Sequence, residues 1–562
     1  MKYIIALLLT VAVLEGCSLK EDLLDVPTPA TINSERDLEV VVKGLYARLN
    51  NSNAFKFRGM AMLFLSADDL YAAASGELLP FSDRTLTSVN VSGFWSVLYF
   101  TIGSANDLIA QLDAKNLDPA AEQRAYGDAY FIRAFCYYYL VRLYGGVPLR
   151  LKATDVDADF YLPRSSVQEV YTQIFSDLER AAALLPLAKN IPVAELGRAS
   201  KGAAQAIYAQ AALTYGNQLA LKGQDGNTYY QKTITYADSV IQSNQYQLLA
   251  NYKDLFDINR ENDAYNEVIF GVRFMVDQQD RAQPAAGSEF ALRFGAPNTH
   301  QVCGNPPNGA GDGSMRVMPW VADYYRTGDY DSLINGIKVI DYRNEGAFFQ
   351  KGYNVTQKKY YAVYPNLPAA DEGTITTPLI SKYIDPNGKD GRNNGNDFFV
   401  IRFAEIYLIK AEAENELNGP TATALEAFNK VRARARNANG IQRAVPANIE
   451  PGISKDAFRV KVFDDRGLEL AGEGQRWFDL VRMRSPLSPS QTMFEYQFKE
   501  VLSKYPQKMP TYNTTTKKYT NEFAVNAPQM SIEMPKSLLY PLPADEITQN
   551  PNIGTANQNP GW

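Results

Sequence analysis

The chain has 562 residues, of which 46% are hydrophobic and 21% charged, so it has the composition of an ordinary globular protein with a large core. Its formal net charge is −6, from 56 basic and 62 acidic side chains, and this balance gives no electrostatic attraction for nucleic acid. The one histidine, His300, excludes a histidine-rich metal centre, and any Ser-His-Asp or Cys-His catalytic site would have to include it.

The first residues are typical of an exported protein. One lysine precedes an apolar run over residues 3–14, and these twelve residues are too few for a bilayer-spanning helix, which needs about 20. Gly16 and Cys17 follow the run and resemble a bacterial lipobox, although Glu15 stands where a small residue is usual. We therefore expect residues 1–16 to be a cleaved signal peptide and Cys17 to be lipidated. The alternative is a plain secretory signal that happens to contain a cysteine.

Amphipathic helical periodicity begins after a linker rich in proline and threonine and then recurs along the chain. The expected helices cover residues 35–49, 94–112, 123–144, 167–185, 200–221, 229–243, 398–417, 422–438 and 454–470. Residues 203–212 and 404–413 resemble each other in their small side chains, and each segment leads into a second helix. This pairing indicates tetratricopeptide-like helical hairpins.

Two stretches of the chain are rich in loops. Residues from about 250 to 397 are rich in Gly, Asn, Pro and Tyr, with short strand-like pieces such as 268–272, and residues 71–93 form a second, shorter stretch. Binding side chains are usually carried on loops that a rigid scaffold holds in place. We therefore expect the ligand site in these two stretches.

Aromatic and polar residues in the loop stretches are the candidates for ligand contact. Trp320, with Tyr324 and Tyr325 close behind it, is the first candidate, because flat rings stack on the apolar faces of sugars while polar groups bind the hydroxyls. The alternative is that these three rings pack inside the loop region, as most aromatic side chains do. Asp83 and Arg84, in the shorter stretch, are secondary candidates.

Charged residues also cluster between Glu473 and Arg482, around Trp477. Two carboxylates beside arginines could serve acid–base chemistry. Opposite charges three or four residues apart on a helix commonly pair, so we favour an ion-pair and packing network here. Trp477 is then expected in the core, whereas Trp95, at the edge of the shorter loop stretch, is also a candidate for ligand contact.

No metal ion or cofactor is expected. Residues 385–391 hint at a calcium loop but lack a ligand at Lys389, and residues 309–313 lack the spacing of a phosphate-binding loop. Cys136 lies in an aromatic run and is expected to be a buried thiol, while Cys303 lies in a loop. Whether these two cysteines pair is left open.

Six segments, in the same order, resemble the SusD/RagB family from one end of the chain to the other. They are residues 95–106, 129–149, 197–204, 396–413, 469–482 and 539–562. The most recognisable segment ends in Tyr144-Gly145-Gly146-Val147-Pro148. The resemblance implies a single mostly α domain over residues 17–562, in which about four tetratricopeptide-like units support a loop-rich ligand-binding region with a few short strands.

The same resemblance implies a function without catalysis. It implies a lipoprotein of the outer membrane, anchored at Cys17 and facing the cell exterior, which caps a TonB-dependent β-barrel transporter of the SusC type. Its ligand would be an oligosaccharide or polysaccharide nutrient that it delivers to this transporter. The alternatives are the same role with a peptide or other nutrient, a surface glycan hydrolase, or a helical-repeat scaffold that binds only proteins.

Overall fold

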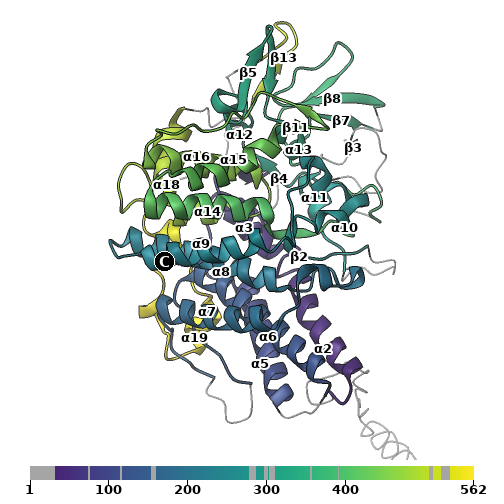
Figure 1. Cartoon of the computed structure of the whole chain (residues 1–562). Coiled ribbons are helices and arrows are strands. Elements are labelled where there is room, and N and C mark those ends of the chain that lie inside the picture. Colours follow the sequence, from purple (N-terminus) through teal and green to yellow (C-terminus); the bar gives the residue numbers. More distant parts are fainter. Residues whose placement is uncertain are drawn as a thin grey trace, which may run out of the picture.

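The computed structural model describes residues 32–73, 76–113, 117–153, 160–276, 286–295, 301–302, 311–354, 357–389, 391–504, 510–520 and 532–562. Helices make up most of the regular structure and the strands are short (Figure 1), so the prediction of a mostly α protein is confirmed.

The long helices agree with the predicted ranges to within a few residues at nearly every end. They are α2 (Glu35–Ala47), α5 (Ser92–Asp113), α6 (Pro119–Tyr144), α7 (Val167–Leu184), α8 (Lys201–Leu221), α9 (Asn227–Gln242), α14 (Phe403–Asn418), α15 (Ala422–Ala435) and α16 (Lys455–Glu469). The shorter helices are α3 (Arg58–Leu65), α4 (Leu79–Ser82), α10 (Glu261–Ala264), α11 (Phe290–Phe294), α12 (Pro319–Tyr324), α13 (Tyr342–Ala347), α17 (Arg476–Arg482), α18 (Met493–Tyr496) and α19 (Ala544–Gln549). Each helix from α5 to α9 packs on the next, and α14 continues the stack against α9, as expected for repeated helical hairpins.

Local sequence explains where these helices begin. Asp118 accepts hydrogen bonds from the first free backbone N–H groups of α6, and Pro119 suits its first turn. Ser166 and Glu169 form a reciprocal capping box at the start of α7. Because α6 is buried on all sides over most of its length, it forms the centre of the helical stack.

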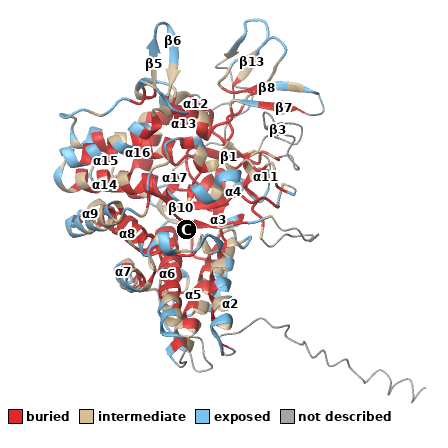
Figure 2. Cartoon of the chain, turned by 45° about the vertical axis from the view of Figure 1, so that its right-hand side comes forward, coloured by how far each residue is buried: buried red, intermediate tan, exposed pale blue. Residues whose placement is uncertain are grey.

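The strands pair mostly in twos, and one sheet has four. They are β1 (Leu70–Ala72), β2 (Val268–Val272), β3 (Gln301–Val302), β4 (Met315–Val317), β5 (Asp331–Ile334), β6 (Ile337–Ile340), β7 (Lys351–Asn354), β8 (Lys359–Val363), β9 (Gly373–Ile375), β10 (Phe398–Arg402), β11 (Asn437–Ala438), β12 (Ile441–Gln442), β13 (Thr511–Asn513) and β14 (Lys518–Thr520). The four-stranded sheet has the order β3-β7-β8-β9. Figure 2 shows the β5–β6 and β13–β14 hairpins projecting at one end of the molecule, while α2 lies towards the other end.

One predicted helix start was wrong. We predicted a helix from residue 398, but Phe398–Arg402 forms β10, which pairs antiparallel with β2, and α14 begins only at Phe403. All five residues of β10 are buried. A continuous apolar run fits a buried strand as well as a buried helical turn, so periodicity could not separate the two.

The charged cluster around Trp477 is a buried ion-pair network, as we favoured. Arg476 binds both carboxylate oxygens of Asp68, at 2.8 and 2.9 Å, and Arg482 binds Asp479 at 2.6 Å. Glu473 accepts hydrogen bonds from Arg402, at 2.7 Å to one of its oxygens. Most of these partners lie far away in sequence, so the network joins separate elements instead of stabilising one helix.

Candidate functional site

The two loop-rich stretches meet where β1 pairs with β4. The register places Tyr71 opposite Arg316, and the backbone N–H of Ala73 donates to the carbonyl of Ser314 at 2.9 Å. Figure 2 shows β1 near α4 and α11. Residues about 245 apart in the chain therefore lie side by side, as a ligand site built from both stretches requires.

We call the polar surface around this pairing the junction site. It combines two aromatic rings with charged side chains that donate and accept hydrogen bonds. Its members are Phe57, Arg58, Tyr71, Glu77, Arg293, Asp312 and Arg316.

Arg293 is the most firmly held of these side chains. Its guanidinium carbon lies 4.2 Å from the centre of the Phe57 ring, and its nitrogens lie 2.7 Å from Glu289 and 3.2 Å from Asp312. A planar guanidinium fixed by an aromatic face and two carboxylates loses little freedom when it binds a further oxygen atom. Arg293 is therefore suited to orienting a ligand.

The rim of the junction site is more open. Arg58 pairs with Glu77 at 3.1 Å, and both side chains are 52% exposed. An exposed pair of this kind contributes little to stability, so ligand hydroxyls can replace its mutual hydrogen bond at small cost. Burial raises the pKa of Tyr71 to about 12, although Arg316 opposes the shift, so the phenol keeps its proton at neutral pH.

This chemistry suits a ligand with many hydroxyl groups. Guanidinium groups donate and carboxylates accept, whereas the rings of Phe57 and Tyr71 are buried in the core. Within the described ranges, no group of three or more His, Cys, Asp or Glu side chains is arranged to hold a metal ion. The charged groups of the site support recognition by hydrogen bonding.

The first candidates that the sequence offered, Trp320, Tyr324 and Tyr325, are buried or half-buried. Trp320 is only 2% exposed, and its indole N–H donates to the carbonyl of Asp68 at 2.8 Å. Tyr325 is also buried, while the half-buried Tyr324 donates to Asp464 at 2.7 Å. The three rings lie together, as predicted, but their burial favours the packing interpretation, and ligand contact by them stays a prediction.

The secondary candidates Asp83 and Arg84 have local roles in the structure. Asp83 accepts hydrogen bonds from the backbone N–H and the hydroxyl of Thr85, at 3.1 and 2.7 Å. Arg84 has a left-handed backbone, with φ +63°, and donates to the carbonyl of Ser66 at 2.8 Å. Burial lowers the pKa of its guanidinium to about 10, with the ring of Phe494 4.6 Å away.

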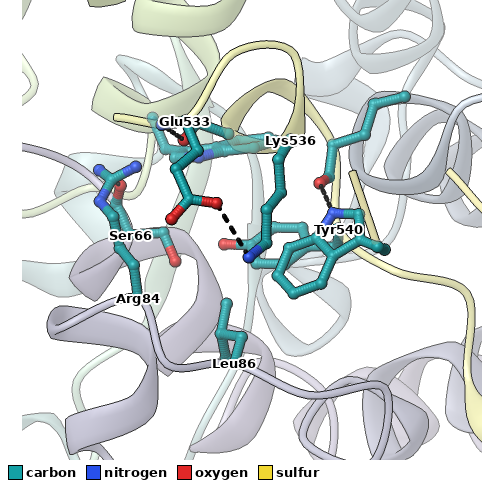
Figure 3. A pocket seen from close by; sticks show the side chains of 10 residues that line it. Ser66, Arg84, Leu86, Glu533, Lys536 and Tyr540 are labelled. Atoms are coloured by element: carbon teal, nitrogen blue, oxygen red, sulfur yellow. Dashed lines mark hydrogen bonds and ion pairs between the residues drawn. The ribbon is translucent and has the colours of Figure 1, made fainter. Parts of the chain in front are cut away.

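Arg84 lines a small pocket under the C-terminal segment (Figure 3). Lys536 and Glu533, paired at 3.1 Å, and Tyr540 belong to the same wall. The cavity has a volume of about 50 Å³, which is far below the several hundred Å³ of typical ligand pockets. It can hold at most a small group, so Arg84 is placed to support the loop and not to hold a sugar ring.

The remaining predicted residues fall in different places. Trp95 is 4% exposed and lines a larger hollow between α5 and α19. Cys136 is a free, buried thiol, and burial raises its pKa. Cys17, His300 and Cys303 lie outside the described residues. No helix in the described part of the chain is long and apolar enough to cross a membrane.

Sequence reasoning missed Phe57, Arg58 and Arg293. None of them stands in a motif, and Phe57 and Arg58 precede the shorter loop stretch. Arg293 lies over the ring of Phe57, 236 positions away in the chain, and no local sequence pattern encodes a contact of that range. These residues could be identified as site candidates only from the folded structure.

Two family profiles match the chain. One describes the SusD family and matches residues 266–562; the other is described as starch-binding, associating with the outer membrane, and matches residues 20–213. Among similar proteins, the SusD-like protein P2 of Formosa agariphila is 26% identical over 584 residues, which covers 100% of both chains. The starch-binding protein SusD of Bacteroides thetaiotaomicron is 31% identical over 163 residues, or 29% of this chain and 26% of that protein.

Solved structures share the fold over nearly the whole length. A SusD homolog from Bacteroides thetaiotaomicron has a TM-score of 0.74 at 21% identity, covering 94% of this chain and 98% of the other. A laminarin-binding SusD-like protein has a TM-score of 0.66 at 22% identity, covering 94% and 100%. At these identities the similarity establishes the fold alone.

Proposed function

The chain belongs to the SusD family, and on this premise we propose that it captures a glycan at the outer membrane and delivers it to a TonB-dependent transporter. Names among its relatives support a glycan ligand, since they include a starch-binding protein, a laminarin-binding protein and a surface glycan-binding protein from Bacteroides fluxus. The observation that carries the proposal is the junction site, where Glu77 of the shorter loop stretch pairs with Arg58, and the longer stretch supplies Arg293, Asp312 and Arg316.

Capture in this proposal involves no covalent step. Arg293 donates to the hydroxyls of a sugar ring, and the buried ring of Phe57, only 8% exposed, holds its guanidinium in place. The exposed Arg58–Glu77 pair opens to bind a further residue of the same glycan. The ligand leaves unchanged, so it can pass to a transporter.

The predicted lipidation of Cys17 supports a position at the membrane. Lipidation of Cys17 would tether the domain of residues 17–562 through its N-terminal side. The helix α2 lies at the end of the molecule remote from the β5–β6 and β13–β14 hairpins (Figure 2), so these hairpins would point away from the tether. An orientation on the outer surface leaves the junction site accessible to glycans in the medium.

Calorimetric titration of the full chain in detergent tests the proposal. The panel contains laminarin, starch, their short oligosaccharides, and peptides. We expect one glycan class to bind, and the double variant Arg58→Ala/Glu77→Ala to weaken that binding about tenfold or more, because the rim contacts are lost without leaving an unpaired charge. The control is Lys338→Ala/Asp331→Ala, which removes another ion pair outside the site and should bind like the wild type.

Three results would contradict the proposal. Binding of peptides alone would change the nutrient class. Release of reducing sugar from a bound glycan would make the protein a hydrolase. Failure of a β-barrel transporter to co-purify with the full chain from outer membranes of its host would remove the delivery step.

A further inference from the structure

A second hollow, between α5 and α19, has the features of a binding site in its own right. We call it the α5–α19 hollow. Its volume is about 560 Å³, within the range of small-molecule sites. It lies outside the junction site, with which it shares no residue, and its lining includes Ser92, Trp95, Tyr99, Arg150, Phe160, Tyr161, Asp545, Glu546 and Gln549.

Two adjacent aromatic side chains at this hollow are exposed to solvent. Phe160 is 49% exposed and Tyr161 48% exposed. Large rings are normally buried, so a contiguous exposed pair beside a concave surface points to a contact partner. Below them, Trp95 and Tyr99 form the floor, with ring centres 4.9 Å apart.

The backbone that carries the two rings is fixed by side chains from elsewhere. Three successive carbonyls each accept a hydrogen bond: that of Phe160 from Arg150, that of Tyr161 from Asn552, and that of Leu162 from Asn550 at 2.9 Å. Because these hydrogen bonds hold the backbone of the segment, the two rings stay exposed and cannot move into the core. The rings are therefore pre-organised for a ligand, which lowers the entropy cost of binding.

The opposite wall supplies polar groups. α19 presents Asp545 and Gln549, whose side chains have no hydrogen-bond partner among the described residues, while the carboxylate of Glu546 accepts from Asn550 at 3.0 Å. With one arginine, Arg150, against two acids, the hollow has no positive excess that would attract an anion. The hollow has exposed aromatic side chains on one wall and hydrogen-bonding groups on the other. This arrangement suits a ligand that is an uncharged ring with hydroxyl groups, such as a sugar.

We infer that the α5–α19 hollow is a second glycan-binding site, in which Phe160 and Tyr161 stack on a neutral pyranose and Asp545 and Gln549 bind its hydroxyls. This inference rests on the proposed function and deepens it, because a chain with two separate sugar sites is suited to a polysaccharide and not to a single short oligosaccharide. A polymer that reaches both sites gains avidity that a short oligosaccharide lacks.

The test counts sites by calorimetry on the full chain in detergent, with short oligosaccharides cut from laminarin and from starch. The wild type is expected to bind two molecules of one oligosaccharide. The variant Phe160→Leu/Tyr161→Leu, which keeps apolar volume but removes both aromatic faces, should bind one, and its affinity for the intact polysaccharide should fall several-fold. Tyr360→Leu is the matched control, since Tyr360 is 45% exposed and lies outside both sites, and it should still bind two.

The outcomes separate the two proposals. If Phe160→Leu/Tyr161→Leu binds like the wild type while Arg58→Ala/Glu77→Ala loses all binding, the second site does not exist and the proposed function stands. Binding in this hollow by peptides but not by sugars would overturn its assigned ligand class. If the wild type binds no sugar at all, both the proposed function and the second site are wrong.

Discussion

At the scale of single residues, the interior of this protein relies on arginines paired with distant carboxylates. Arg476 and Asp68 lie 408 positions apart, yet they form a two-pronged contact that is almost completely buried. A guanidinium matches a carboxylate in shape and stays charged when it is buried. Removing one member of such a pair strongly destabilises the fold, because the other charge then remains buried without a partner.

The first prediction concerns this pair. Arg476→Met should lower the free energy of unfolding by about 3–5 kcal/mol, because Asp68 would remain as a buried charge without its partner. Urea unfolding followed by circular dichroism measures the change. Lys43→Ala, which removes an exposed partner of Glu39, is the control and should change little. A loss for Arg476→Met as small as that of the control would contradict the role of the pair.

Asp69, next to this pair, gives a prediction about pH. Burial and the charge of Asp68 raise the pKa of Asp69 to about 7, well above the value of about 3.9 of an unfolded aspartate. The folded chain therefore holds the proton more tightly, and its stability falls as the pH rises from about 4 to about 7. Asp69→Asn should remove this loss, so its melting temperature should exceed that of the wild type at pH 8 more than at pH 4. An equal difference at both pH values would show that Asp69 does not titrate in this range.

At the scale of elements, the helices were predictable and the strand pairings were not. Helix starts follow from local chemistry, as at Ser200, where we placed a helix start and where α8 begins one residue later. The pairing of β1 with β4 depends on contacts between residues about 245 positions apart, and no local pattern encodes it. For this reason the sequence indicated the two loop stretches that form the junction site, but not the arginines that they bring together.

Ser200 also provides a test at this scale. Its hydroxyl accepts a hydrogen bond from the backbone N–H of Ala203 at 3.0 Å and lies 2.7 Å from the hydroxyl of Tyr246. Ser200→Ala should lower the free energy of unfolding by about 1–2 kcal/mol, since a helix cap and a buried partner are lost together. Ser239→Ala, at a half-buried position inside α9, should have a smaller effect in the same urea titration. Equal effects would mean that the cap contributes nothing.

At the scale of the whole molecule, the C-terminal segment packs against two helices from the first part of the chain. Tyr540 donates to the carbonyl of Met62 at 2.9 Å, and the amide of Asn559 donates to the carbonyls of Tyr144 and Tyr540, at 2.9 and 2.7 Å. The segment thus connects α3 with the end of α6. It was recognised in the sequence as a family motif, but its contacts explain it physically, because they close the core and form one wall of the α5–α19 hollow.

The last prediction follows from this closure. Asn559 is 3% exposed and also accepts a hydrogen bond from Arg164 at 2.8 Å, so Asn559→Ala leaves several buried groups unpaired and should lower the free energy of unfolding by about 2–3 kcal/mol. Asn557→Ala is the control, because Asn557 is exposed and its side-chain amide makes one local hydrogen bond, to Ile553 at 2.6 Å. Both variants are compared by urea unfolding and by limited proteolysis. We expect the tail of Asn559→Ala alone to become cleavable under native conditions, and equal protection of the two variants would mean that the segment is held by packing and not by this amide.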